Sequence, residues 1–251
     1  MKFAILTPIG PGRDWLLDGV WPQALEAAGC PKSETRLCVV NNSGTHSVRR
    51  KVAGIASAMG WAEWRIADNR EQGSGLHERR EGLSSHMADN YARLLAMAGD
   101  AEFSLTLETD ITLPGRGELG GLCAFDHMMD GMAEDVAMVG TPVCSRWSAS
   151  DKRVSVYRVS NTKRWPKDKT RPPVRETGFE EVHAFGHSCV LMRTAPVREA
   201  GFSATPNVDG SGGPGHEWGN QKRLMRAGWR LLVDWGVKPL HWKSPTEWVK
   251  A

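Results

Sequence analysis

The amino-acid sequence predicts an α/β domain whose mostly parallel central sheet is flanked by helices. Short apolar segments of strand length alternate along the chain with longer segments of helical periodicity, a pattern typical of parallel sheets. The 251 residues, of which 40% are hydrophobic, are enough for one hydrophobic core. We find no repeat of fixed period and no linker between two cores, so we expect a single domain over residues 1–251.

The first half of the chain shows the more regular alternation. Its first strand is followed by the turn-forming sequence GPGR and an amphipathic helix, which Gly29 and Pro31 end. The second strand ends in the turn-forming sequence NNSG. In chain order, the expected elements are a strand at Lys2–Ile9, a helix at Asp14–Ala28, a strand at Thr35–Val40, a helix at Val48–Gly60, a short strand at Trp64–Ala67, a helix at Ser84–Ala98 and a strand at Phe103–Leu107.

The second half is less regular and richer in glycine. Gly228 is expected to end a helix that carries Trp218, Leu224 and Met225 on one face. The loop Gly210–Gly215 before this helix lacks the GxxxxGK[ST] phosphate-binding pattern and suits a lid that orders over a ligand. The expected elements are a helix at Leu119–Met132, strands at Val136–Val139 and Cys189–Met192, a short helix after the latter, a helix at Glu217–Ala227 and a final strand at Trp229–Trp235.

We find neither a secretory signal nor a membrane-spanning segment in this sequence. The apolar start of the chain is too short for a secretory signal, and no stretch approaches the roughly 18 apolar residues of a membrane-spanning helix. The five cysteines are odd in number and none stands in a CxxC pair, so we expect buried thiols rather than disulfides or a structural zinc site. These features favour a cytoplasmic protein.

Positive charge is concentrated in residues 146–176, which we call the basic segment. Ten lysines and arginines against three acidic residues give it a charge of +7, whereas the whole chain carries +3. Trp147, Tyr157 and Trp165 lie among these charges, a composition suited to phosphates and stacked rings. The alternative is a solvated, positively charged surface loop.

Two carboxylates follow the strand at Phe103–Leu107. In an extended chain, Glu108 and Asp110 project to the same side while Thr109 points away, so both carboxylates reach one volume. A divalent cation such as Mg²⁺ or Mn²⁺ relieves their repulsion, because it prefers oxygen ligands. Parallel α/β sheets bind ligands beyond the carboxyl ends of their strands. The spacing therefore indicates a metal site, with a solvated turn as the alternative.

The order of these elements and motifs resembles the GT-A (Rossmann-like) fold of nucleotide-diphospho-sugar glycosyltransferases, above all the family 2-like members. Glu108-Thr109-Asp110 resembles the DxD motif that binds the metal and the donor diphosphate in that family, with glutamate in place of the first aspartate. The sequences AILTPIGPG and LCVVNNSG resemble the first two strands and their turns, with asparagines in place of the aspartate of the base-binding turn. The resemblance spans most of the chain but omits the basic segment.

A second motif of the same family is an acidic pair that opens a helix, then an arginine, a glycine that ends the helix, a strand and a histidine. In HEWGNQKRLMRAGWRLLVDWGVKPLHW these positions fall on Glu217, Arg223, Gly228 and His241, and His216 replaces the first acid. The resemblance implies that Glu217 is the catalytic base and that His241 joins Asp110 as a metal ligand. The alternatives are an ordinary helix-start glutamate and a structural histidine.

The resemblance implies a metal-dependent, inverting glycosyltransferase that uses Mn²⁺ or Mg²⁺ and a nucleotide sugar, with UDP-sugars favoured. Residues 1–115 would bind the nucleotide sugar, and residues 116–251 would form the acceptor side. The residues implied for donor binding are Thr7, Pro8, Gly10, Asn41, Asn42, Glu108 and Asp110.

The acceptor and two other function classes stay open. The basic segment suits a polyanionic acceptor such as DNA with hydroxylated bases, flipped out to meet Glu217, or an anionic glycan. A sugar-phosphate nucleotidylyltransferase has a related sheet, but TPIGPGR contains only part of its glycine-rich loop with arginine and lysine. The last class is a nucleic-acid-binding module without catalysis, whose binding would fall steeply with salt and ignore metal.

Overall fold

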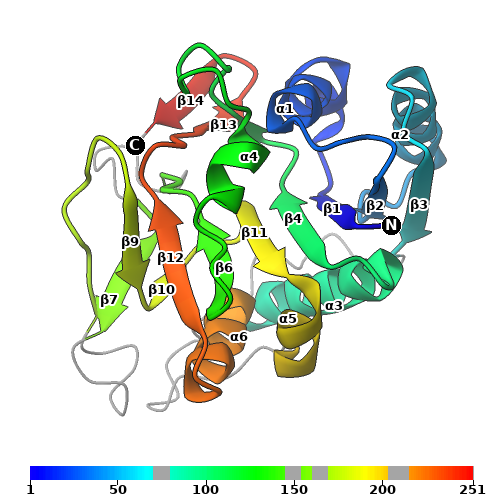
Figure 1. Cartoon of the computed structure of the whole chain (residues 1–251). Helices are drawn as coiled ribbons and strands as arrows, with labels where there is room; N and C mark the ends of the chain where they lie inside the picture. The colour runs from blue at the N-terminus through cyan, green and yellow to red at the C-terminus, as the bar shows by residue number, and fades with distance from the viewer. Residues whose placement is uncertain (70–79, 145–153, 160–168, 203–214, 251) are drawn as a thin grey trace.

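The structure is a computed structural model that describes residues 1–69, 80–144, 154–159, 169–202 and 215–250 (Figure 1). Its strands are β1 (Phe3–Ile9), β2 (Thr35–Asn41), β3 (Glu63–Asp68), β4 (Phe103–Leu107), β5 (Ile111–Thr112), β6 (Val136–Gly140), β7 (Val156–Val159), β8 (Lys169–Thr170), β9 (Phe179–Val182), β10 (Ala184–Phe185), β11 (Cys189–Arg193), β12 (Arg230–Asp234), β13 (Leu240–Ser244) and β14 (Glu247–Lys250). Its helices are the 3-10 helix η1 (Asp14–Asp18) and the α-helices α1 (Val20–Ala28), α2 (His46–Ala58), α3 (Arg80–Ala98), α4 (Ala124–Met129), α5 (Thr194–Ala200) and α6 (Gly215–Arg226).

An eight-stranded sheet in the order β3-β2-β1-β4-β11-β6-β12-β9 forms the centre of the molecule. The strands β3, β2, β1 and β4 are parallel neighbours, and β6 is parallel to β12. β11 is antiparallel to both β4 and β6, so β4 and β6 point the same way, and β9 is antiparallel to β12 at the edge. This sheet confirms the predicted fold class, a mostly parallel sheet flanked by helices.

Helices cover both faces of this sheet (Figure 1). One face packs against apolar residues of α1, α2 and α4, and the opposite face packs against α3, α5 and α6. In β1, Ile5 joins the first of these cores, whereas Ala4 and Leu6 join the second. Because both faces are covered, every residue of β1 and β4 is buried. The buried hydroxyls of Thr7, Ser104 and Thr106 are hydrogen-bonded within the fold.

The helix expected at Asp14–Ala28 is divided in two, and that prediction was wrong. The 3-10 helix η1 ends at Asp18, and α1 begins at Val20 after Gly19. Pro22 explains the break, because a proline inside one long helix would lack a hydrogen bond to Asp18 and clash with its carbonyl. In the first turn of a new helix, the missing N–H has no cost.

The helix expected at Leu119–Met132 is also shorter, because α4 covers only Ala124–Met129. Gly120 and Gly121 before it have φ values of 65° and 99°, which belong to left-handed or extended turn conformations that a helix does not contain. α4 instead begins after the N-cap residue Cys123, whose sulfur accepts a hydrogen bond from the backbone N–H of Asp126.

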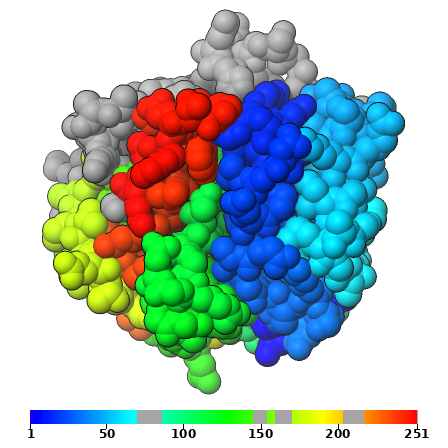
Figure 2. Space-filling view, turned by 90° about the horizontal axis from the view of Figure 1, so that it is seen from above, coloured from blue at the N-terminus to red at the C-terminus, as the bar shows by residue number. Residues whose placement is uncertain are grey.

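The sequence had predicted that the strand at Trp229–Trp235 is the last one, and this prediction was wrong. Two more strands, β13 and β14, follow β12. β13 and β14 form an antiparallel pair, and β13 also pairs with β5, which directly follows the two carboxylates. Seen from above, this C-terminal pair (red) lies beside the N-terminal segment (dark blue) in Figure 2. Trp15 and Trp242 connect the two segments with ring centroids 6.4 Å apart. The C-terminal strands therefore bring residues near 240 to the loop after β1.

A second small sheet has the order β10-β7-β8. It places the described part of the basic segment next to α6, because β10 contacts that helix.

All five cysteines are buried thiols, as expected. Among the described residues, no helix is both long enough and apolar enough to cross a membrane.

Candidate metal and nucleotide site

The carboxyl end of β4 carries the two acidic residues singled out in the sequence. β4 is a wholly buried strand between β1 and β11, and its apolar sequence ends at Leu107. Glu108 and Asp110 follow where the chain leaves the sheet, and Asp110 is only 3% exposed. A buried carboxylate needs a cation or hydrogen-bond donors to offset its lost hydration.

His241 reaches the same point from the far end of the chain. Its strand, β13, pairs with β5 so that His241 is opposite Ile111, and the backbone N–H of Trp242 donates to the carbonyl of Asp110 at 2.8 Å. The indole N–H of Trp242 adds a 2.8 Å hydrogen bond to the hydroxyl of Thr112. This short β ladder fixes the imidazole beside the two carboxylates.

Glu108, Asp110 and His241 form a cluster in which one ligand atom from each lies within 4.8 Å of the others. Nδ1 of His241 is 2.7 Å from the carbonyl oxygen of Cys144, so Nδ1 carries the proton of a neutral ring and donates it there. In the neutral ring, the form that can bind a metal, Nε2 holds a lone pair that faces Oδ2 of Asp110 at 3.4 Å, without hydrogen-bond geometry. A lone pair and two carboxylates that converge repel one another, and a divalent cation between them turns this repulsion into coordination. The residues present therefore fit such a cation.

The charges of this cluster change the acidity of their neighbours. Burial by itself would lower the pKa of His241, but the adjacent Asp110, the Cys144 carbonyl and the charge of Glu108 together raise it. Burial is the main reason that the pKa of Tyr91 is raised, followed by the charges of Glu108 and Glu217. The site is thus strongly negative, which favours a cation.

Arg13 and Tyr91 belong to the site but were not among the predicted site residues. A guanidinium nitrogen of Arg13 lies 4.0 Å from Oδ2 of Asp110, and the hydroxyl of Tyr91 lies 3.4 Å from a carboxylate oxygen of Glu108. The sequence offered a signal for Arg13, because it ends the GPGR turn after the first strand. Tyr91 gave no such signal, since it is an apolar-face residue of α3.

Glu217 lies in the first turn of α6, where the sequence had predicted it. It is half-buried, and its charge contributes to the raised pKa of Tyr91, which places it within electrostatic reach of the cluster. Its role as a base stays a prediction. The loop proposed as a lid, residues 210–214, lies outside the described residues.

The predicted donor residues at the end of β1 are largely engaged within the fold. Thr7 is fully buried, donates a 2.8 Å hydrogen bond to the carbonyl of Leu107 and accepts one from the indole N–H of Trp21 at 3.3 Å. Pro8 is buried, whereas Gly10 is partly exposed. The hydroxyl of Thr7 therefore ties β1 to β4, and Gly10 presents backbone near the site.

The end of β2 holds the two asparagines expected to face the nucleotide. The side-chain N–H of Asn41 donates to Oδ1 of Asp68 at 2.9 Å, and Asp68 also binds Arg49 at 2.7 Å. Asn42 is 2% exposed, and its side-chain oxygen has no hydrogen-bond partner within the described residues. Asp68 from the neighbouring strand thus lies beside Asn41 at the end of β2, which sequence order did not indicate.

The basic segment is only partly described. Trp147 and Trp165 lie outside the described residues, whereas Tyr157, Arg158, Arg171 and others are placed on or beside β7 and β8. The buried carboxylate of Glu180 binds Arg158 and, at 2.8 Å, Arg175. Two arginines on one carboxylate keep this part of the surface positive.

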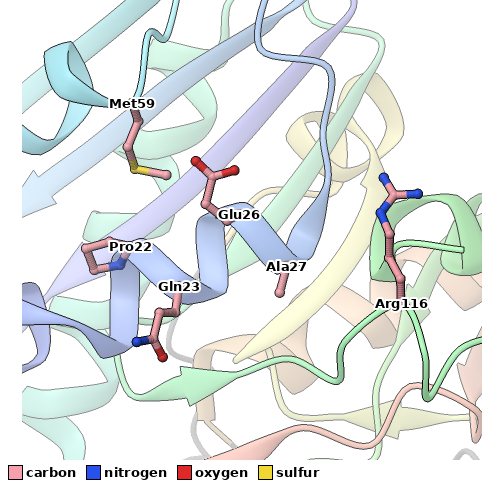
Figure 3. A pocket seen from close by; sticks show the side chains of 6 residues that line it. All are labelled: Pro22, Gln23, Glu26, Ala27, Met59 and Arg116. Atoms are coloured by element: carbon pink, nitrogen blue, oxygen red, sulfur yellow. The ribbon is translucent and has the colours of Figure 1, made fainter. Parts of the chain in front are cut away.

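One surface hollow of about 600 Å³ lies away from the acidic cluster (Figure 3). Its lining is mostly apolar, and its one acidic residue, Glu26, is paired with Lys32 at 2.6 Å. The lining residues are Pro22, Gln23, Glu26, Ala27, Met59 and Arg116. Without a convergent set of polar groups, this hollow does not compete with the cluster as a candidate site.

The chain was compared with known proteins at three levels. No protein-family model matches the sequence, and no curated protein matches it by sequence. Similar solved structures include the mannosyltransferase PcManGT from Pyrobaculum calidifontis in complex with GDP-Man and Mn²⁺, with 14% identity, a TM-score of 0.54, and coverage of 93% of this chain and 56% of that one. GalNAc-T7, solved with UDP, GalNAc and Mn²⁺, has 11% identity and a TM-score of 0.60 over 99% of this chain and 45% of that one.

A third similar structure is the inositol-1-phosphate CTP transferase from T. maritima, with 13% identity, a TM-score of 0.53, and coverage of 98% of this chain and 90% of that one. The chain spans about half the length of the two glycosyltransferases. At these identities the likeness concerns the fold alone. The chain has a GT-A-like fold, as the sequence had predicted.

Proposed function

We propose that the protein is a metal-dependent glycosyltransferase that moves a sugar from a nucleotide-diphosphate donor to an acceptor hydroxyl. One observation carries this proposal: Glu108, Asp110 and His241 converge at the carboxyl end of β4 in a GT-A-like fold. Ligands in parallel α/β sheets bind beyond that end of the strands. The similar glycosyltransferases were solved with GDP-Man or UDP and with Mn²⁺, which supports a nucleotide-sugar donor and Mn²⁺ or Mg²⁺, with UDP-sugars tested first.

The three residues of the cluster would hold the cation, with Nε2 of His241 and carboxylate oxygens as ligands. When bound, such a cation offsets the negative charge that develops on the leaving diphosphate. Arg13, 4.0 Å from Asp110, is placed to add a second positive group to the same region. Asn41, Asn42 and the backbone at Gly10 would position the nucleotide.

Glu217 is proposed as the base of an inverting, single displacement. Its carboxylate would take the proton of the acceptor hydroxyl as that oxygen attacks the anomeric carbon and the nucleoside diphosphate leaves. The acceptor that we propose is DNA with hydroxylated bases, since the basic segment combines cations with aromatic rings.

We place this activity in the cytoplasm, where five unpaired thiols are stable.

Nucleotidyl transfer is a second candidate function. It is favoured by the similar CTP transferase structure, which this chain matches over nearly its full length, and by the approach of Arg13 to Asp110 in the loop after β1. Such an enzyme would join a nucleoside triphosphate to a sugar phosphate and release pyrophosphate. Pyrophosphate release from CTP or UTP, in the presence of a sugar phosphate, would distinguish it from sugar transfer.

Calorimetric titration of UDP and UDP-glucose with and without Mn²⁺ tests the glycosyltransferase proposal. We expect binding to the wild type to require Mn²⁺ and to be lost in Asp110→Ala. GDP-mannose is the second donor to test, because one similar enzyme was solved with it. Nucleotide binding that is equal with and without metal, or equal in Asp110→Ala, would contradict the proposal.

A further inference from the structure

One surface of the molecule combines an arginine with two aromatic rings on the acceptor side. Tyr157 in β7 packs against Ala184 of β10 and against Trp218 of α6. The ring centroids of Tyr157 and Trp218 are 4.9 Å apart at an interplanar angle of 61°. Both rings are only half-buried, so each keeps part of its surface exposed.

Arg171 completes this surface from the neighbouring strand. β7 and β8 are antiparallel, with Arg158 opposite Thr170, so Arg171 comes to lie beside Tyr157. Its guanidinium carbon is 5.1 Å from the centre of the Tyr157 ring, and a guanidinium nitrogen is 3.4 Å from the phenol oxygen. Arg171 is exposed, and a guanidinium stacked on a ring keeps donors at its edge for an anion.

This surface is structurally continuous with the candidate site. The carbonyl of Cys144 holds the imidazole of His241, and Cys144 also bridges to Val154 at the start of the segment that carries β7. Tyr157 is three residues further on, which corresponds to about 10 Å of extended chain. On the other side, Trp218 directly follows Glu217, the proposed base. An acceptor held on Tyr157, Arg171 and Trp218 would thus lie at the end of α6 that carries Glu217.

We propose that Tyr157, Arg171 and Trp218 form the acceptor-binding surface of the protein and that they bind a nucleic-acid strand, with bases stacked on the rings and a phosphate on Arg171. This inference rests on the proposed function, and it adds the residues that select the acceptor.

The rings are the reason to choose a nucleic acid over an anionic glycan. Cations alone would hold any polyanion, whereas stacked rings favour ligands with flat faces, and every base has one. Arg158 and Arg175 share the single carboxylate of Glu180, so the surface next to Tyr157 stays positive and suits successive phosphates. A flipped or single-stranded base also satisfies the requirement that its hydroxyl reaches Glu217.

Fluorescence anisotropy with a labelled single strand of about 12 nucleotides tests this inference. The strand carries one 5-hydroxymethylcytosine, and an abasic strand of the same length serves as a ligand control. The protein variants are Tyr157→Ala, Tyr157→Phe, Arg171→Ala and Arg171→Lys. Arg65→Ala is the matched control, because the Arg65 side chain is 45% exposed on β3, at the opposite edge of the sheet.

We expect the wild type to bind the base-containing strand more tightly than the abasic strand. Tyr157→Ala and Arg171→Ala should each weaken binding about tenfold, and Tyr157→Phe should stay close to the wild type because it keeps the ring. Arg171→Lys should keep the charge but lose the stacked plane, so its affinity should lie between those of Arg171→Ala and the wild type. Arg65→Ala should bind like the wild type. Since Arg171 is exposed, its variants test the surface even if Tyr157→Ala does not fold.

Three results would overturn the inference: equal affinity for both strands, equal losses in Arg171→Ala and Arg65→Ala, or tighter binding of heparin that depends on Tyr157 and Arg171. The last result would assign the surface to an anionic glycan. The anisotropy measurement contains neither metal nor donor, so its failure is distinct from failure of the metal-dependent UDP titration, which tests the glycosyltransferase proposal.

Discussion

The two ends of the central sheet differ in how closely cationic side chains approach their carboxylates. At the amino end, Glu63 is held by Arg36 at 2.7 Å and by Arg65 at 2.8 Å, and the pairing with Arg36 is the main reason that its pKa is lowered. At the carboxyl end, Asp110 has His241 at 3.4 Å and Arg13 at 4.0 Å. Glu108 lies in the same cluster with its own negative charge.

We interpret the difference as a division between a charge that stabilises the fold and charges that are available to a ligand. Glu63 has cations at hydrogen-bond distance, so its charge is offset by the protein itself. At the carboxyl end the protein gathers two carboxylates and an imidazole nitrogen, and among the described residues Arg13 lies 4.0 Å from Asp110, where the attraction is weaker than at hydrogen-bond distance. We therefore expect a cation from solution to bind more tightly at the carboxyl end than at the amino end.

The sharpest test of this comparison is Asp110→Asn, which keeps the size of the side chain and removes its charge. We expect sugar-transfer turnover to fall by about 10³-fold or more, because the metal site loses a charged ligand. Steady-state kinetics over a range of Mn²⁺ concentrations measures the effect. Glu63→Gln is the matched control, since it also neutralises one carboxylate, and it should keep wild-type turnover.

Glu217→Gln should have the next largest effect. Turnover should fall by about 10² to 10³-fold, because an amide cannot accept the proton of the acceptor hydroxyl. Binding of UDP with Mn²⁺ should stay unchanged, since Glu217 is not one of the cluster's ligands. A variant that turns over normally would remove Glu217 from the mechanism, and lost donor binding would assign it to the donor site instead.

His241→Ala tests whether the imidazole is a ligand or a structural group. We expect the affinity for Mn²⁺ to fall by at least about tenfold, because a fixed nitrogen ligand is lost. His127→Ala is the control, since His127 also pairs with a carboxylate, that of Asp234, at 2.7 Å. Equal Mn²⁺ affinity in the wild type and His241→Ala would leave His241 a structural role only.

The smallest effect is expected at the amino end of the sheet. Because the folded-state pKa of Glu63 is lowered, its ionised form stabilises the fold above its ordinary pKa of 4.5, and this contribution is lost as the pH falls through the folded-state value. Glu63 is partly exposed, so Glu63→Gln should lower the free energy of unfolding at pH 7 by about 1 kcal/mol or less. Urea unfolding at pH 7 and at decreasing pH should show this difference shrink below pH 4.5.

Much of the first half of the fold was predictable from the sequence, because its signals are local. The buried strands β1, β2 and β4 are rich in apolar and β-branched residues, and α3 and α6 begin and end near the expected residues. The errors have local causes too: Pro22 forces a helix to restart, and two glycines shorten α4. The short strands β5, β7, β8, β9, β10, β13 and β14 were missed, since segments of two to five residues show little periodicity.

For the candidate site, the sequence by itself determined that Glu108 and Asp110 leave one strand on the same side and that Glu217 opens a helix. The family resemblance had also implied that His241 joins Asp110, and the structure places it there. The tertiary structure alone decided that Arg13 and Tyr91 lie beside those carboxylates, that Asp68 stands beside Asn41, and that Arg171 stacks on Tyr157. The physical reason is the range of the interactions. Backbone direction and hydrophobic periodicity act between near neighbours in the chain, whereas a site is made of side chains that only packing and strand pairing bring together.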